Sequence, residues 1–408
     1  MTVAVRSDPL QEAAISSASI MRPEADMACE NTDRRQANTD NLHGHHVYQD
    51  RNDIVYRQLY TITIIGPAVT MTASTPPSTS FTATRINTTT FLITEDDSYA
   101  EHPFIYAKLH PNAPLLILSD TGCDSPRDKD HQIVHLKALL ETHALACNNG
   151  LPLNPLQGGR RRDYMIICTH CHYDHIGGIE QLATRQATIV ASKHGRSFIE
   201  EDLATHSLCK YRRMRTPRYR VSHWAEDRED LKWPLSSSMS KVNLGITTLQ
   251  TPGHTPDSLA WYDSSERHLY VGDSFYEMGS DGMPIIFPKE GDWVTFMRSM
   301  GALRDFVLEQ NAVVEGVEEG WVEVLPRVKV GCGHQTAAAD AEEMVEAVVG
   351  IFERIIAGKV PVVMSEEVRG EVYDLWKEEG EGVRFSVRAP RRLCEEARRH
   401  RGGAFAST

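Results

Sequence analysis

The segment ICTHCHYDHIGG, residues 167–178, constrains this chain more than any other part of the sequence. It places His170, His172, Asp174 and His175 within six consecutive positions. Imidazoles titrate near neutral pH and compete for the same hydrogen-bond partners, so crowding them is costly unless a ligand holds them together. Imidazole and carboxylate groups are common ligands of metal ions. We therefore predict a metal site here rather than a polar surface loop.

The residues around this motif place it on a loop between a strand and a helix. The run YMIIC, residues 164–168, is short, apolar and rich in β-branched and aromatic side chains, which predicts a buried strand. Gly177 and Gly178 end the motif, and IEQLA, residues 179–183, is typical of a helix start. Loops held by such a scaffold commonly carry binding and catalytic residues.

Alternation along an extended chain gives a first expectation for the side chains. Residues two apart point to the same face, so His170, His172 and Asp174 should face one way. His175 would join them only where the chain bends, and the two glycines that follow it permit such a bend. The four side chains would then surround a space that suits a metal ion.

The motif resembles the metal-binding motif of the metallo-β-lactamase superfamily, which needs three further ligands in a set order. The segment TPGHTP supplies His254, YVGD supplies Asp273 after an apolar strand, and VGCGH supplies His334. Upstream, PLLILSDTGCD is similar to the family's Asp-x-Gly, with an aspartate, Asp120, that supports the site without binding metal. The resemblance runs from about residue 91 to residue 358. It is specific for the fold and the metal, but not for the substrate.

The resemblance implies an α/β fold, a four-layer αββα sandwich with two metal ions at one edge. The implied ligands of the first ion are His170, His172 and His254, and those of the second are Asp174, His175 and His334. Asp273 would bridge the ions, because a carboxylate has two oxygens. Two zinc ions are expected, although manganese or iron also suits these donors. Ions about 3.5–4 Å apart can activate a bridging hydroxide as the nucleophile. Asp174 would orient it and move protons.

The expected activity is hydrolysis of a small-molecule carboxylic ester, lactone or thioester. A β-lactamase is less expected, because the commonest zinc β-lactamases have cysteine where this chain has Asp273. A redox role is also less expected, because electron-transfer relatives usually have glutamate where this chain has His172. Two alternatives stay open. One is a phosphodiesterase-type hydrolase on the same metal site, and the other is a metal-binding scaffold without turnover.

Composition narrows the partners and the compartment. The net charge of −13 argues against nucleic acid as the main partner, because phosphate binding needs clustered positive charge. Eight cysteines scattered through a long chain that is too large to need disulfide bonds suit a reducing compartment, so a cytoplasmic location is expected. No apolar leader follows Met1. The longest early apolar run, residues 54–69, is interrupted by Arg57 and too short to span a membrane.

Changes in composition divide the chain into three parts. Residues 1–85 are polar and rich in Thr, Ser and Pro, which predicts a disordered extension. A chain that starts at Met71 is therefore expected to keep the folded part. Residues 86–360 form the predicted metallo-β-lactamase-like domain, with helices where one apolar face repeats, above all at 292–311 and 342–358. Residues 361–408 are predicted to be a helical, basic extension.

A cleft-side insertion is predicted at about residues 194–241. Its segment KYRRMRTPRYR, residues 210–220, holds five arginines and one lysine. By the resemblance, this region would shape the substrate cleft, and Arg213 and Arg215 would hold an anionic part of the substrate. The alternative is a solvated basic face, and the sequence favours neither.

Overall fold

A computed structural model describes residues 77–184, 187–234, 241–312, 315–318, 321–323, 325–380 and 382–405. The predicted disordered extension and the Met71 start therefore lie almost wholly outside the described residues. Its predicted end at residue 85 is wrong, because residues 81–85 form a strand that pairs with the next strand along its whole length. Phe81 is buried in the core, which explains why this alternating segment, FTATR, belongs to the folded domain.

The first sheet has seven strands in the order β1-β2-β3-β4-β5-β6-β7. Its strands are β1 (Phe81–Arg85), β2 (Thr90–Glu95), β3 (Phe104–Leu109), β4 (Leu115–Ser119), β5 (Asp163–Ile167), β6 (Thr188–Ser192) and β7 (His223–Ala225). The pairs from β1 to β4 are antiparallel, and those from β4 to β7 are parallel. The predicted strand at 164–168 is confirmed as β5.

The second sheet has six strands in the order β16-β15-β11-β10-β9-β8. Its strands are β8 (Glu229–Trp233), β9 (Val242–Gln250), β10 (Leu259–Asp263), β11 (His268–Tyr270), β15 (Lys329–Gly331) and β16 (Ala339–Asp340). Only β11 and β15 pair in parallel. The strands β7 and β8 lie within the predicted insertion at 194–241, but they are edge strands of the two sheets and so belong to the sandwich itself. The insertion is therefore shorter than expected. Its helices are α4 (Arg196–Glu201), α5 (Leu203–His206) and α6 (Cys209–Arg212).

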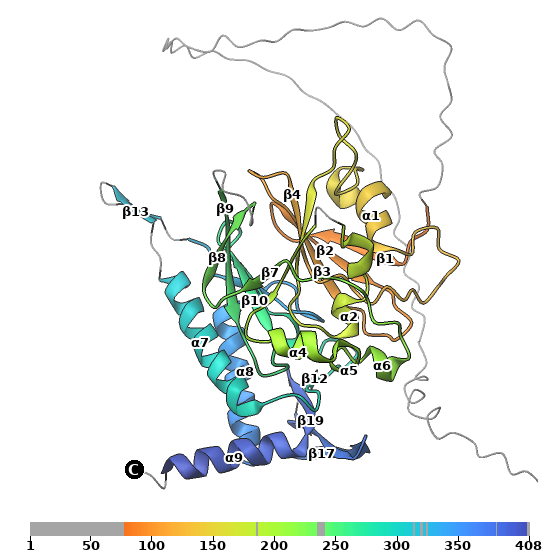
Figure 1. The fold of residues 1–408 in the computed structure, drawn as a ribbon. Coiled ribbons are helices and arrows are strands. Elements are labelled where there is room, and N and C mark those ends of the chain that lie inside the picture. The colour runs from red at the N-terminus through yellow and green to blue at the C-terminus, as the bar shows by residue number, and fades with distance from the viewer. Residues whose placement is uncertain are drawn as a thin grey trace, which may run out of the picture. The chain divides into compact units, whose positions relative to one another are not determined.

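The two sheets pack face to face, with helices on their outer sides (Figure 1). One hydrophobic cluster joins Ile117 and Met165 of the first sheet to Trp261 and Tyr270 of the second. Separate clusters lie on the outer faces. The helices of these outer layers are α1 (Leu136–Thr142), α2 (Tyr173–Ile176) and α3 (Ile179–Leu182) on the first sheet, and α7 (Trp293–Asn311) and α8 (Ala341–Ile356) on the second. The predicted four-layer αββα sandwich is confirmed.

The two long helices begin where the sequence predicts. The carboxylate of Asp292 accepts hydrogen bonds from the backbone N–H groups of Val294 and Thr295 at the start of α7. Asp340 does the same for Glu343 at the start of α8. These caps satisfy N–H groups that have no partner inside the helix. The two short 3-10 helices of the described residues are η2 (Ala146–Asn148) and η3 (Gly272–Ser274). The strands β13 (Glu315–Glu318) and β14 (Trp321–Glu323) pair in a separate two-stranded sheet.

The C-terminal segment forms a third, four-stranded sheet in the order β12-β19-β18-β17, followed by α9. Its elements are β12 (Ile285–Ile286), β17 (Val362–Val368), β18 (Glu371–Lys377), β19 (Ser386–Pro390) and α9 (Arg391–Phe405). The predicted helical character of residues 361–408 is therefore wrong before Arg391, where the chain forms β17, β18 and β19, and holds for α9. Arg369 and Gly370 have φ of 53° and 80°, which matches the two-residue turn of a β-hairpin.

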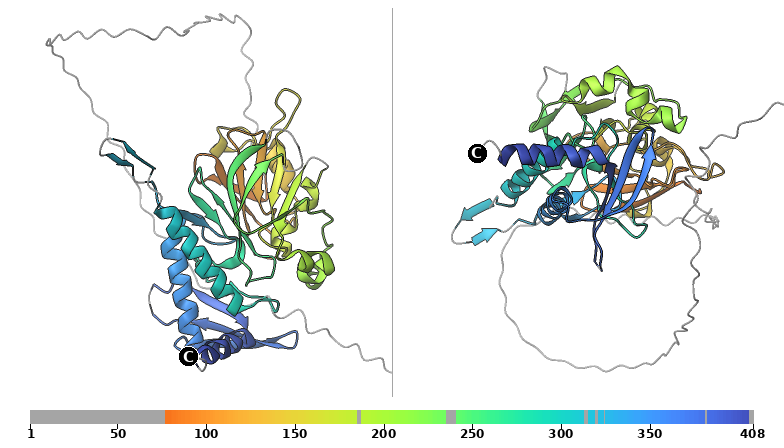
Figure 2. Two further views of the ribbon diagram at one scale, coloured as in Figure 1. Left: turned by 60° about the vertical axis from the view of Figure 1, so that its left-hand side comes forward. Right: turned by 90° about the horizontal axis from the view of Figure 1, so that it is seen from below.

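This C-terminal part is not a separate extension. Trp376, Val387 and Leu393 share one hydrophobic cluster with residues of α7 and α8. Figure 2 shows α9 crossing near one end of this helix pair. The described residues contain no helix with both the length and the apolar character that a membrane crossing requires.

Candidate metal centre

The motif after β5 changes conformation halfway along. The chain is extended at His172, and α2 begins at Tyr173. His170 and His172 share one side, as alternation predicts, but the helical turn directs Asp174 and His175 into a second, neighbouring group. The expected bend that brings His175 into the site is present, but the start of α2 provides it and the glycines after His175 do not. The two glycines that follow have φ of −53° and −83°, values that any residue adopts in a helix.

Close packing explains these glycines instead. A Cβ atom on Gly177 would lie 2.2 Å from the carbonyl oxygen of Cys123, and one on Gly178 would lie 2.5 Å from that of Thr121. Real Cβ atoms do not approach a backbone oxygen so closely. The glycines therefore let the helices after the motif pack directly on the loop that follows β4.

Gly177→Ala is expected to lower the free energy of unfolding by about 1–3 kcal/mol or more, because the added methyl group must displace a backbone segment. Urea denaturation measures the loss. The control is Gly301→Ala in α7, where a Cβ has nothing within 4 Å. That change is expected to stabilise by about 0.5–1 kcal/mol, since alanine favours a helix over glycine. Equal stability of the two variants would contradict the packing explanation.

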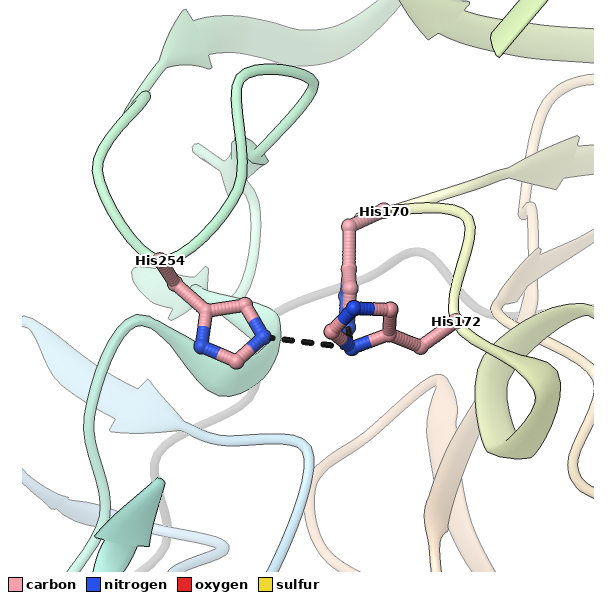
Figure 3. A group of neighbouring side chains, drawn as sticks. All are labelled: His170, His172 and His254. Atoms are coloured by element: carbon pink, nitrogen blue, oxygen red, sulfur yellow. Dashed lines mark hydrogen bonds between the residues drawn. The ribbon is translucent and has the colours of Figure 1, made fainter. Parts of the chain in front are cut away.

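The first group consists of three buried imidazoles, those of His170, His172 and His254 (Figure 3). His170 Nε2 lies 2.9 Å from His172 Nδ1, and His254 Nε2 lies 3.3 Å from the same atom. Three nitrogens bound at about 2.0–2.1 Å to one tetrahedral zinc ion lie about 3.3 Å apart. The spacing of this group therefore suits a single ion.

The second group consists of two carboxylates and two imidazoles: Asp174, His175, Asp273 and His334. Asp174 Oδ2 lies 3.4 Å from His175 Nε2 and 3.3 Å from His334 Nε2. Asp273 Oδ1 lies 3.3 Å from His175 Nε2, and its Oδ2 lies 3.5 Å from His334 Nε2. These separations again suit four donors around one cation.

Asp273 lies between the two groups. It sits on η3, directly after β11, with its Oδ2 also 3.9 Å from His170 Nε2 of the first group. A carboxylate that faces imidazoles of both groups has the geometry of a bridging ligand. The structure thus brings together all seven residues that the resemblance implies as ligands.

Two buried atoms test whether a cation fits. His175 Nε2 and Asp273 Oδ1 have no hydrogen-bond partner among the described residues, although they lie 3.3 Å apart. Buried polar atoms without partners are rare and costly in proteins. Lone pairs that converge in this way are satisfied by a divalent cation, so the residues fit the metal binding that the fold implies.

Neighbouring groups hold two of these imidazoles in place. Asp120 accepts hydrogen bonds from the backbone N–H and the hydroxyl of Thr169, and its Oδ2 lies 3.0 Å from His175 Nδ1. The carbonyl oxygen of Glu101 lies 2.9 Å from His334 Nδ1. Metal-binding histidines usually donate their second ring N–H to a carboxylate or carbonyl. The supporting role of Asp120 follows the resemblance, whereas a backbone carbonyl leaves no signal in the sequence.

The two groups differ in electrostatics. Burial lowers the pKa of His172 to about 3, and His254 acts in the same direction, so this imidazole is neutral and its lone pair is free. Burial also opposes a charge on His334, but Asp273 and Asp174 outweigh it and raise the pKa to about 10. A divalent cation competes with the proton for this lone pair, so metal binding at the second group is expected to release protons.

A cavity of about 200 Å³ opens above the metal centre. Its floor includes His172, His254, Asp174, Asp273 and His334. Its walls come from three further segments, with Leu208 and Arg212 from the insertion, Met283, Ile286, Phe287, Pro288, Lys289 and Glu290 around β12, and Val368, Arg369, Glu371, Tyr373 and Arg388 from the C-terminal sheet. The sequence did not predict that the C-terminal segment contributes to this cavity.

The basic insertion reaches the cavity only in part. Arg212 lines it and pairs with Glu101 at 2.7 Å. Arg213 and Arg215 do not line it, and Arg215 pairs with Glu180 at 2.7 Å. The interpretation that these two arginines hold a substrate at the cleft is therefore wrong. The reason is local, because Arg213 follows the last residue of α6 in a left-handed conformation and the chain then turns.

Comparisons with known proteins found one family model and several relatives. The model of the metallo-beta-lactamase superfamily matches residues 165–310. "Putative transcription factor avaE" of Aspergillus versicolor is 31% identical over 69% of this chain and 78% of that protein. Human acyl-coenzyme A thioesterase MBLAC2 is 29% identical over 41% of this chain. A hydroxyacylglutathione hydrolase of Bradyrhizobium sp. is 26% identical over 28% of this chain.

These matches cover unequal shares of the relatives. The chain spans 56% of the human thioesterase and 34% of the bacterial hydrolase. Among solved structures, a metallo-beta-lactamase from Pontibacter korlensis is 14% identical, with a TM-score of 0.40, over 66% of this chain and 98% of that protein.

Proposed function

This chain belongs to the metallo-β-lactamase superfamily, and from that premise we propose that it is a dinuclear metal-dependent hydrolase of a carboxylic ester, lactone or thioester. One observation carries the proposal. Seven buried donor groups form two sets that share Asp273, directly beneath a cavity. Two zinc ions are the proposed cofactors, held by His170, His172 and His254 on one side and by Asp174, His175 and His334 on the other. Manganese or iron also suits this mixture of nitrogen and oxygen donors.

The chain's own residues have distinct roles in this proposal. When bound, the ions would supply Lewis-acid activation of a carbonyl and a water molecule of lowered pKa. Asp174 lines the cavity, and its Oδ2 faces His334 and His175. We assign it the roles of orienting the water and moving its proton. The floor residues are almost fully buried, so their donor atoms are held in fixed positions by the surrounding protein.

The cavity wall favours an acyl substrate over a phosphodiester. Met283, Ile286 and Phe287 give it an apolar side next to His254. Such a surface suits an acyl chain, since burial of apolar area is favourable. The thioesterase and the glutathione-thioester hydrolase among the relatives support the same class, and thioesters are therefore the substrates to try first.

We expect metal-loaded protein to hydrolyse acyl thioesters or esters, and we expect a chelator to abolish the activity and added zinc to restore it. The assay is a panel of thioesters, lactones and a phosphodiester. His254→Ala should lose the activity, because it removes a donor of the first group. The matched control is His400→Ala, which changes an exposed histidine on α9. Turnover of the phosphodiester alone would contradict the proposal and favour a phosphodiesterase-type hydrolase. No turnover of any substrate would favour a metal-binding scaffold without activity.

A further inference from the structure

The C-terminal hairpin brings one arginine to the cavity in an unusual setting. Arg369 lies in the turn between β17 and β18 and lines the cavity. Its guanidinium carbon lies 3.6 Å from the centre of the Tyr211 ring, which belongs to α6. Two segments that are far apart in the sequence thus meet at the cavity through this stacked pair.

The other cations of the cavity wall are neutralised by carboxylates. Arg212 pairs with Glu101 at 2.7 Å, Lys289 with Glu290 at 3.6 Å, and Arg388 with Glu366 at 2.5 Å. The nearby acid Glu371 is likewise paired, with Arg392. Arg369 forms no ion pair within the part of the chain that the structure describes, and its contact is with Tyr211. It therefore supplies the positive charge that the wall leaves uncompensated.

Stacking prepares a guanidinium group to bind an anion. The face of the group rests on an aromatic ring, while its N–H donors point outward in the plane of the group. This planar fork matches the geometry of a carboxylate or a phosphate. Because stacking on Tyr211 already restricts the side chain, less conformational entropy is lost when an anion binds.

We propose that Arg369, held by Tyr211, binds an anionic group on the leaving part of the substrate while the acyl part lies at the metal centre. The inference rests on the proposed function and adds to it a substrate class, acyl compounds that carry a carboxylate or phosphate away from the reacting bond. It also assigns anion recognition to the C-terminal hairpin rather than to Arg213 and Arg215.

The test uses one acyl group on three thiols. Coenzyme A carries phosphates, glutathione carries carboxylates, and N-acetylcysteamine is neutral. Arg369→Gln is expected to raise KM about tenfold for at least one charged thioester, with kcat unchanged, because a hydrogen-bonded charge pair is lost. KM for the neutral thioester should not change. The charged thioester that is affected identifies the anion as a phosphate or a carboxylate.

Two controls separate this effect from a general disturbance. Arg213→Gln removes a neighbouring exposed arginine that does not line the cavity, and it should leave all three KM values unchanged. Raising the salt concentration should shrink the tenfold difference, because exposed charges are screened over about 8–10 Å at physiological ionic strength. Equal kinetics of Arg369→Gln and the unaltered protein on the charged thioesters would overturn the inference.

A binding measurement keeps the inference separate from the proposed function. S-methyl coenzyme A and S-methyl glutathione cannot be hydrolysed as thioesters, so calorimetry with metal-loaded protein reports binding alone. At least one of these two compounds should bind the unaltered protein about tenfold more tightly than it binds the Arg369→Gln variant. If neither binds, or if both bind the two proteins equally, Arg369 is not an anion subsite. If binding differs but no thioester turns over, the anion subsite stands and the proposed thioesterase activity fails.

Discussion

Replacement of Asp273 with alanine is expected to reduce the bound metal from two ions per chain to less than one. Its Oδ1 faces His175, and its Oδ2 faces both His334 and His170, so each group loses a donor. Loss of a supporting neighbour alone typically costs a metal site about 10–100-fold in affinity, and loss of a shared ligand should cost more. Elemental analysis of purified protein gives the metal content, and turnover should fall at least as steeply.

His334→Ala provides the comparison that makes this result specific. His334 belongs to the second group alone, so its removal should leave about one ion per chain, held by the first group. Asp305→Ala, which changes an exposed aspartate on α7, should keep both ions. One ion in the unaltered protein would contradict the dinuclear proposal. Equal metal content in Asp273→Ala and His334→Ala would contradict the bridging role.

Replacement of Lys108 with methionine is expected to lower the free energy of unfolding by about 3–5 kcal/mol. Lys108 lies on β3 of the first sheet, and its Nζ is 2.5 Å from Asp263 Oδ2 at the end of β10 in the second sheet. Both side chains are at most 1% exposed. Thr89 and Ser265 accept the remaining hydrogen bonds of the ammonium group. The variant would therefore leave a buried carboxylate without its counter-charge.

The double variant Lys108→Met with Asp263→Asn should recover most of this loss, because it removes the uncompensated charge and keeps an oxygen for the backbone N–H of Ser265. Arg228→Met breaks an exposed pair with Glu309 and should cost less than about 1 kcal/mol. Urea denaturation at equal metal content measures all three. A loss for Lys108→Met no larger than for Arg228→Met would show that the buried pair does not stabilise the sandwich.

The sequence predicted those parts of the molecule that depend on neighbours along the chain. The strand before the motif and the start of a helix after it follow from short apolar and glycine patterns. The two long helices follow from apolar residues repeated along one face, whereas their caps, Asp292 and Asp340, were identified only in the structure. His254, Asp273 and His334 were named only through the family resemblance, because nothing local shows that such distant segments meet.

The parts that the sequence did not predict depend on contacts across the fold. Lys108 on a strand looks like a solvent-facing residue until the second sheet brings Asp263 to it. The carbonyl that orients His334 belongs to Glu101, and every residue has such a carbonyl. In the C-terminal part, charged residues suggested a helix, whereas Arg369 and Gly370 supply a hairpin turn. That Arg212 and not Arg213 lines the cavity is decided by a difference of one position at the end of α6.

The pairing of β19 with β12 has a consequence for how this protein is made. Ile285 pairs with Val387 and Ile286 with Arg388, so one wall of the cavity is completed by strands near the end of the chain. During synthesis, the ribosome has already produced every residue of the metal centre once it passes His334, before it reaches Arg369. A message cut short between these points by a premature stop codon would encode the full set of seven donors without the hairpin that carries Arg369 to the cavity.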